Sequence, residues 1–548
     1  MQRRRFLKNL SYAAGSTFVL NNLPFSTVSS AAPLSQLAAT STNDRVLVLI
    51  QLHGGNDGLN TIIPIDQYAE YYQLRPNLAI PDKGKRKYIP IDSGLPDANQ
   101  LGFHPDLTHM KDLYDHGKLS IVQNVAYENS NGSHFRSRDI WFMGGDYDDY
   151  LPSGWMGRYL DHIFPGYPES YPNTTMPDPL AIEIGNGVSL AFHRSNGIPV
   201  AISIQNPDQF YDLINSVGGE PPESIANTHY GKELKWIMDI EEKSNQYAGR
   251  LKDVYDSGAN SPNVTYPELY PFNAPPGRIR NTLAPQLKMI ARLLSGGVKT
   301  KIFIARLGGF DTHAEQVETY DATMGTHSAL LYHISSAMKA FQDDLKSLGL
   351  EDRVMTMTFS EFGRRAFSNG SYGCDHGTAA PMFVFGKMVN PGVFGENPDL
   401  SNLDNGNLPF KFDYRQVFTS ALVDWLEADA AAVEATLFSD WVDRKLQLVG
   451  NGITGLKEEF LKKRNFLAEC YPNPVSSQTT FSFRISAAGR VRIDILDTQG
   501  RVVKTVIDEH REAGQSTIPA DLSMFRQGTY LYRLTGKSID VTKKLIKL

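Results

Sequence analysis

The chain has 548 residues, of which 41% are hydrophobic and 21% are charged, a composition typical of globular proteins that bury a large core. This length predicts two to four domains. The formal net charge of −6 argues against nucleic acid as the main partner, because phosphate binding needs a basic face. The two cysteines, Cys374 and Cys470, are expected in different domains, so no disulfide framework is predicted.

Residues 1–43 are predicted to be an export signal followed by a linker. Three arginines at positions 3–5 precede a modestly apolar stretch over residues 13–20, and small residues follow at 29–32. This pattern resembles a twin-arginine signal, which delivers folded cargo to the twin-arginine translocase. An ordinary signal peptide or a generic basic start is the alternative. The apolar stretch is too short for a permanent membrane span, and no later stretch reaches about twenty apolar residues.

Residues 44–450 are predicted to form an α/β domain with a mainly parallel sheet. Continuous apolar runs indicate strands that are buried on both faces, and helical patterns lie between some of them. Strands that alternate with helices favour a parallel sheet flanked by helices. Residues 151–283, which begin with a stretch rich in Pro, Tyr and Gly, are expected to form an elaboration over the site. The predicted strands are 45–52, 119–123, 180–184, 301–307, 354–359 and 382–385, and the predicted helices are 104–116, 284–294 and 327–348.

Polar side chains gather where the predicted strands end, and again in the loop before the last of them. In an open α/β sheet, the loops at the carboxyl ends of the strands converge on one crevice. Carboxylates and imidazoles in such loops indicate a metal site or an acid/base site. The candidates, in chain order, are His53, Asn56, Asp57, Ser133, His134, Arg136, Asp311, His313, Glu361, Arg364, Asp375 and His376.

Each candidate taken alone also has a structural explanation. Asp57 lies among glycines and is typical of a turn, and Ser133 lies in an ordinary polar loop. Asp311 is a possible helix cap, and Glu361 a possible ion-pair partner of a neighbouring arginine. The adjacent Asp375 and His376 are the stronger signal. The joint pattern carries more weight than any member, provided that the strands share one sheet.

Residues 466–548 are predicted to form a separate β-sandwich, connected by a linker over residues 451–465. Short alternating segments are separated by turn signals such as residues 497–500 (Asp-Thr-Gln-Gly). The module resembles the C-terminal sorting domain of type IX secretion cargo, on the basis of residues 471–474, 497–501, 528–533 and 541–544. This resemblance implies recognition by the type IX outer-membrane translocon, and a location at the surface or outside a Bacteroidetes-type cell. An accessory carbohydrate-binding sandwich is the alternative.

A second resemblance covers nearly all of residues 44–450. The segments 51–60, 133–135, 308–313, 360–364 and 375–381 are similar to the signature of the secreted bacterial family called domain of unknown function 1501. That family resembles the alkaline phosphatase and sulfatase superfamily, whose strand-end carboxylates and histidines bind divalent metals beside a nucleophile. The resemblance implies metal ligands at Asp57, Asp311, His313, Glu361, Asp375 and His376, and a nucleophile at Ser133.

Three departures from the superfamily pattern weaken the expectation of a second metal and of phosphatase-level activity. Glu361 is followed by Phe362 where the superfamily has a histidine. Asp311 and His313 are two residues apart instead of four, and no Cys/Ser-x-Pro-x-Arg sequence occurs, which argues against a formylglycine sulfatase. His53 or His134 could supply the missing imidazole.

These patterns predict a secreted or cell-surface hydrolase that acts on phosphate or sulfate esters. The mixed nitrogen and oxygen donors favour Zn²⁺ or Mn²⁺. Arg136 or Arg364 would hold the anionic ester, because a guanidinium can bind two oxygens at once. One alternative is a non-catalytic binding or structural protein on the same fold. Another is a metal-free hydrolase that uses Ser133 with His134 or His376.

Overall fold

The computed structural model of the protein describes residues 17–20, 23–26, 43–168, 170–205, 246–450, 465–467, 470–537 and 539–548. The predicted twin-arginine motif and nearly all of the predicted linker at 451–465 lie outside these residues. The chain divides into two compact units, of which the second consists mainly of residues 451–548. None of the helices in the described part of the chain has the length and apolar character needed to cross a bilayer.

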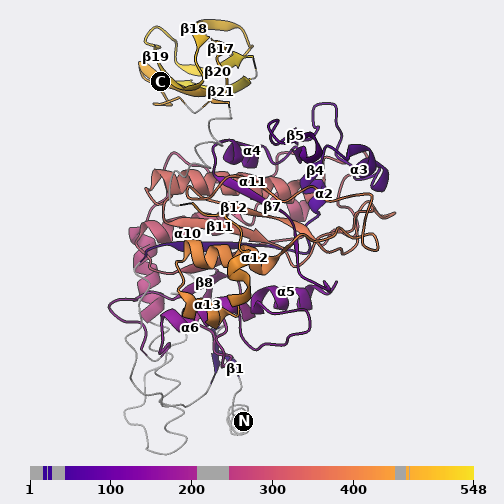
Figure 1. The fold of residues 1–548 in the computed structure, drawn as a ribbon. Helices are drawn as coiled ribbons and strands as arrows, with labels where there is room; N and C mark the ends of the chain where they lie inside the picture. Colours follow the sequence, from indigo (N-terminus) through magenta and orange to yellow (C-terminus); the bar gives the residue numbers. More distant parts are fainter. Residues whose placement is uncertain are drawn as a thin grey trace, which may run out of the picture. The chain divides into compact units, whose positions relative to one another are not determined.

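A nine-stranded sheet forms the centre of the first unit (Figure 1). Its strands follow the order β13-β7-β12-β11-β3-β10-β8-β9, and β14 pairs with β7. Val48 and Ile50 of β3 are fully buried on one face, and Leu47 and Leu49 on the other, which explains the continuous apolar run. The strands are β3 (Val46–His53), β7 (Leu119–Ala126), β8 (Ala181–Ile184), β9 (Ala201–Ile204), β10 (Ile302–Gly308), β11 (Val354–Phe359), β12 (Ala380–Phe385), β13 (Gly392–Phe394) and β14 (Phe412–Asp413).

Strand direction confirms the mainly parallel α/β class, with one informative exception. The strands β9, β8, β10, β3 and β11 are parallel neighbours, whereas β12 is antiparallel to both β11 and β7. The loop that precedes β12 therefore lies at the same sheet edge as the loops that follow β3, β10 and β11. Because β12 runs in the opposite direction, the residues just before Ala380 lie at the same edge as the other polar loops.

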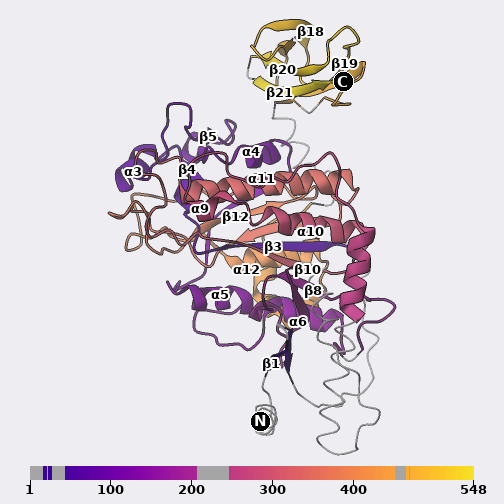
Figure 2. The same ribbon diagram turned by 180° about the vertical axis from the view of Figure 1, so that it is seen from behind.

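Helices cover both faces of this sheet (Figures 1 and 2). One face carries α10 and α11, and the other carries α5, α6, α12 and α13. The second face contributes the aromatic part of the core, in which Trp141 of α5 stacks on Phe359 of β11. These helices are α5 (His134–Met143), α6 (Trp155–Ile163), α10 (Ala284–Ser295), α11 (Thr326–Ser347), α12 (Tyr414–Ser420), which continues into the π-helix η3 (Ala421–Trp425), and α13 (Ala430–Thr436).

Shorter elements complete the first unit. Residues 151–283, expected to lie over the site, supply α6 and the strands β8 and β9 of the sheet, and their residues 206–245 lie outside the described part. The remaining elements are β1 (Thr17–Leu20), β2 (Leu23–Ser26), α2 (Gly58–Thr61), β4 (Ile62–Pro64), α3 (Tyr68–Leu74), β5 (Ile89–Pro90), η1 (Asp97–Asn99), β6 (Leu101–Phe103), α4 (Thr108–Asp115), η2 (Leu190–Phe192), α9 (Pro276–Ile279) and η4 (Ser439–Arg444).

The second unit is a β-sandwich, as the alternating segments predicted. Its two sheets have the strand orders β15-β16-β19 and β18-β17-β20-β21, with antiparallel pairing throughout. Phe481 and Tyr532 pack together in the buried core that the two sheets share. The strands are β15 (Phe466–Leu467), β16 (Gln478–Ile485), β17 (Gly489–Leu496), β18 (Val502–Arg511), β19 (Gly514–Asp521), β20 (Gly528–Gly536) and β21 (Ile539–Lys547).

Candidate metal centre

Loops from distant parts of the sequence meet at one edge of the main sheet. The loop after β3 packs against the loop after β10 so closely that a side chain at Gly54 would be 2.2 Å from the backbone nitrogen of Asp311. Gly54 also has a φ of +125°, which only glycine adopts without strain. The glycines after β3 therefore permit the close approach that brings Asp311 to this edge.

Asp311 lies among three imidazoles. Its Oδ2 is 3.4 Å from Nε2 of His134, and its Oδ1 is 3.3 Å from Nε2 of His313 and 3.2 Å from Nε2 of His376. His134, Asp311 and His376 each offer one ligand atom within 4.8 Å of the others, and His313 joins them through Asp311 and His376. Ligands at the Zn–N distance of about 2.0–2.1 Å in a tetrahedron are about 3.3 Å apart. The spacing around Asp311 therefore fits a divalent cation.

The opposite nitrogen of each ring is bound to an acceptor. Nδ1 of His134 donates to Glu361 Oε1 at 2.9 Å, Nδ1 of His313 to Asp375 Oδ1 at 3.1 Å, and Nδ1 of His376 to the carbonyl of Gly132 at 2.7 Å. A carboxylate or carbonyl can only accept, so each Nδ1 carries a proton, and Nε2 is the nitrogen of each ring that faces Asp311. This arrangement is typical of metal-binding histidines, whose second nitrogen is oriented by an acceptor.

Two further observations indicate that a cation belongs among these nitrogens. The Nε2 atoms of His313 and His376 are only 2.8 Å apart. Two lone pairs at this distance repel each other unless a proton or a metal lies between them. Nε2 of His134 and Oε2 of Glu361 are buried without a hydrogen-bond partner among the described residues, and buried polar atoms of this kind are uncommon in native proteins.

The electrostatics of Asp311 and His376 favour the protonation states that bind metals. Burial raises the pKa of Asp311, but the hydrogen bond from Arg364 and the charge of its guanidinium outweigh burial and lower the pKa to about 2. Burial lowers the pKa of His376 below its ordinary value. The hydrogen bond to Glu361 raises the pKa of His134, so its free nitrogen is a stronger base. Metal ligation requires an ionised carboxylate and neutral imidazoles.

Arg364 holds the loops of this centre in place. Its guanidinium is fully buried and donates to Oδ1 of Asp311 at 2.7 Å. It also donates to four backbone carbonyls, those of Gly54, Gly55, Phe310 and Cys374. Arg364 was predicted to bind the anionic ester, but in this structure its donors are engaged by the protein and it acts on the site by positioning Asp311.

The structure brings most of the predicted ligand residues together in two roles. Asp311, His313 and His376 contact one another, whereas Glu361 and Asp375 bind the far sides of His134 and His313. His134 was predicted as one of two substitutes for the missing histidine, and as a partner of Ser133 in a metal-free hydrolase. The signal for His134 was its place directly after a polar loop that follows a strand. His53, the other substitute, is exposed, and its ring lies 6.2 Å from that of His134.

Asp57 is not brought into this cluster. Both oxygens of its carboxylate accept hydrogen bonds from Arg75 at 2.7 Å. Oδ2 accepts a further hydrogen bond from Gln316 at 2.6 Å. Asp57 and Arg75 are both fully buried. The carboxylate that was predicted to bind metal at the end of β3 is therefore the partner of a buried arginine, and it caps α2.

Ser133 and Arg136 lie at the start of α5 and make structural contacts there. The Ser133 hydroxyl caps the helix by accepting from the backbone nitrogen of Arg136 at 3.5 Å. The Arg136 guanidinium donates to the carbonyls of Tyr147 and Asp149 at 2.6 and 2.5 Å, and lies over the ring of Tyr150. Among the described residues, no hydrogen bond or ion pair of either side chain reaches the cluster.

Comparisons with known proteins agree with the two resemblances seen in the sequence. Residues 277–411 match a family model described as "Protein of unknown function (DUF1501)", and this segment contains Asp311, His313, Glu361, Arg364 and His376. Residues 469–548 match the "Secretion system C-terminal sorting domain". A type IX sorting domain implies export to the cell surface or the extracellular space. None of the curated proteins compared with the sequence matches it.

Solved structures with a similar chain path include a protein of the alkaline phosphatase superfamily from Vibrio parahaemolyticus, with 10% identity over 82% of this chain and 77% of that chain (TM-score 0.30). Alkaline phosphatase from the Antarctic bacterium TAB5 shows 10% identity over 63% and 92% (TM-score 0.24). Dimeric latent PorU from Porphyromonas gingivalis shows 23% identity over 18% of this chain (TM-score 0.14), and the chain spans only about 10% of PorU. Scores this low carry no conclusion about chemistry, which has to follow from the side chains themselves.

We expect Asp57→Asn to destabilise the first unit without removing metal. The change leaves the Arg75 charge buried and unpaired, which costs about 3–5 kcal/mol. Denaturant unfolding and metal analysis of the same preparations would measure both effects. The matched variant His376→Ala leaves no buried charge unpaired, and should lose metal with a smaller loss of stability. Loss of metal in Asp57→Asn protein that is still folded would return Asp57 to the ligand set.

The same pair predicts how stability depends on pH. Burial raises the pKa of Asp57, but Arg75 outweighs burial and lowers the pKa from 3.8 to about 2. A carboxyl with a lowered folded pKa stabilises the protein above its unfolded pKa, and that stabilisation is lost as the pH falls from about 4 to about 2. We expect the pair to account for about 2 kcal/mol of this loss. Unfolding free energies of the wild type and Asp57→Asn, measured across this range, should converge at low pH.

Proposed function

We propose that the protein is an exported, metal-dependent hydrolase of phosphate or sulfate esters. The observation that carries this proposal is the convergence of three imidazole Nε2 atoms on the ionised carboxylate of Asp311, with an acceptor behind each ring. The mixed nitrogen and oxygen donor set suits Zn²⁺ or Mn²⁺. The proposed export route is the twin-arginine translocase followed by the type IX outer-membrane translocon.

The residues of the site would divide the work as follows. A divalent cation bound here supplies a Lewis acid for the ester and lowers the pKa of a bound water. His134, Asp311 and His376 hold it, with His313 beside them, and Glu361 and Asp375 fix the orientation of two of the rings. Asp311 and His313 are 48% and 47% exposed, so this side of the centre is open to an ester arriving from solvent. Ser133, next to His134 in the chain, remains the proposed nucleophile, with a water molecule as the alternative.

A non-catalytic binding or structural role is the second candidate, and a specific observation favours it. Of the arginines predicted to hold the anionic ester, Arg364 is buried and donates to backbone carbonyls and Asp311, and Nη2 of Arg136 donates to two backbone carbonyls. A site that binds a metal without a free guanidinium nearby would stabilise the charge of the transition state less well. Metal-replete protein that hydrolyses neither class of ester would support this role.

We expect His376→Ala to remove the metal and the activity together. Metal content, measured by inductively coupled plasma mass spectrometry, should fall from near one equivalent to background. Hydrolysis of p-nitrophenyl phosphate or p-nitrophenyl sulfate should fall at least about 100-fold, the scale of a lost metal contribution. His162→Ala is the matched control, because His162 lies on α6, outside the metal centre. Activity that survives both His376→Ala and a chelator would point instead to the metal-free hydrolase.

We expect Glu361→Gln to weaken metal binding while leaving the metal ligands in place. Glutamine can still accept from Nδ1 of His134, but it removes the negative charge that makes this imidazole a stronger base. Changes of this kind reduce metal affinity by about 10–100-fold. Competition with a fluorescent chelator would measure the affinity. An unchanged metal affinity would show that Glu361 does not orient a ligand.

A further inference from the structure

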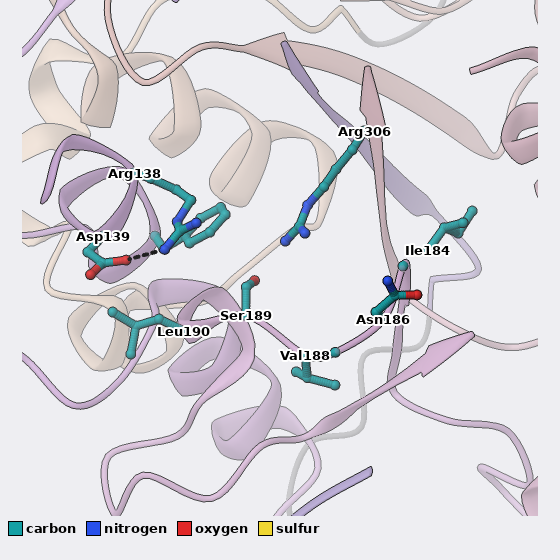
Figure 3. A pocket seen from close by; sticks show the side chains of 11 residues that line it. Arg138, Asp139, Ile184, Asn186, Val188, Ser189, Leu190 and Arg306 are labelled. Atoms are coloured by element: carbon teal, nitrogen blue, oxygen red, sulfur yellow. Dashed lines mark ion pairs between the residues drawn. The ribbon is translucent and has the colours of Figure 1, made fainter. Parts of the chain in front are cut away.

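A cavity lies near the candidate metal centre and is lined by residues of α5 and β10, the elements that also lead to that centre. Residues at the carboxyl ends of β8 and β10, the middle and last turns of α5 and the loop over residues 185–190 line a cavity of about 490 Å³ (Figure 3). Ligand sites for small molecules commonly have volumes of about 300–1,000 Å³. The polar side chains that line the cavity are Arg138, Asp139, Asn186, Ser189 and Arg306.

The wall of this cavity contains hydrogen-bond donors without partners. Arg306 donates one nitrogen, Nη2, to Glu183, while its Nε is buried and has no partner among the described residues. The Ser189 hydroxyl is also buried and has no partner among those residues. Figure 3 shows Arg306 and Arg138 directed toward the cavity from β10 and from α5, with Ser189 below them. The Arg306 side chain is 35% exposed, so its guanidinium is open to an acceptor in the cavity, and unpartnered buried polar atoms beside it are uncommon in native proteins.

The negative charges near the cavity are already matched. Glu183 is fully buried, and its oxygens are taken by Arg306 and by the backbone nitrogen of Ser189, the latter at 2.7 Å. Asp139 lies 3.5 Å from Arg138 and is 41% exposed. The groups left to meet a ligand are therefore mainly donors on cationic or neutral side chains, which suit an anionic oxygen group.

The chain connects this cavity to the metal centre directly. Helix α5 begins with His134 and carries Arg138 four residues later, which corresponds to about 6 Å along the helix axis. Arg306 lies on β10, five residues before Asp311. One molecule that reaches both places would carry an ester at one end and a second acidic group at the other.

We propose that this cavity binds a carboxylate or sulfate group on a sugar-sized molecule, next to the ester that the metal centre meets. The substrate class is then an ester that bears a second anionic group. The substrate class rests on the proposed function, whereas the binding of an anionic group in the cavity does not.

Isothermal titration calorimetry with the full exported chain, freed of metal by a chelator, tests the binding. The probes are D-glucuronate and D-galactose 6-sulfate, with D-glucose as the neutral control. We expect at least one anionic probe to bind and glucose not to bind. Binding of one probe alone would identify the acidic group as carboxylate or sulfate. Failure of both anionic probes to bind would overturn the proposal.

Two variants and a control assign the binding to the cavity. Ser189→Ala and Arg138→Gln should each weaken binding at least about fivefold, the effect of one lost hydrogen bond. His376→Ala should bind the probe as the wild type does, so the result is independent of the metal and of turnover. Wild-type affinity in both cavity variants would overturn the proposal.

Thermal unfolding separates a binding role for Ser189 from a structural one. The buried hydroxyl has no partner among the described residues, so its removal should leave the unfolding temperature unchanged or raise it. Weaker binding without loss of stability is therefore the expected result for Ser189→Ala. A lower unfolding temperature together with unchanged binding would show that the hydroxyl supports the fold instead.

Discussion

The buried guanidinium of Arg364 is the contact on which the functional edge of this protein depends. It joins the loop after β3, the loop after β10 and the loop before β12 through hydrogen bonds to their carbonyls, and it binds the carboxylate of Asp311. A planar group with five donors can satisfy this many acceptors in a fixed geometry, which a lysine cannot do. Burying a charge in this way is costly unless every donor is engaged. The loops are therefore held together by the same group that keeps Asp311 ionised.

A second ion pair, between Asp57 and Arg75, stabilises the same edge of the sheet. Asp57 and Arg75 form a closed unit, and Arg75 also donates to the carbonyls of Arg365 and Ala366, just beyond Arg364. The two arginines thus stabilise consecutive parts of one loop, but only Arg364 contacts the metal centre. This division explains how a site made almost entirely from loops can keep its imidazoles oriented, since ligands need supporting contacts as well as correct identity.

The metal centre and the neighbouring cavity share two elements, α5 and β10. Helix α5 carries His134 and Arg138, and β10 carries Arg306 and is followed by Asp311, so the separation of the two sites is set by one helical turn and the residues at the end of this strand. This arrangement suits a substrate with two acidic groups. Arg364 at the candidate centre is engaged by backbone carbonyls and by Asp311, whereas Arg306, with an unpartnered Nε among the described residues, lies in the cavity. Substrate charge would then be recognised beside the metal rather than at it.

The sequence alone determined the α/β domain and the C-terminal sandwich, and it pointed to most of the residues that meet at the candidate metal centre. Strand burial and turn chemistry are local properties, so the predicted strand over residues 354–359 coincides with β11, and Asp311, His313 and His376 were recognisable at strand ends. The tertiary structure alone decided which polar groups meet. The antiparallel direction of β12 brings His376 to the shared edge, and the start of α5 supplies His134. Asp57 instead forms a buried ion pair with Arg75. Strand direction and the partner of a buried charge depend on contacts between residues far apart in the chain, which no local pattern encodes.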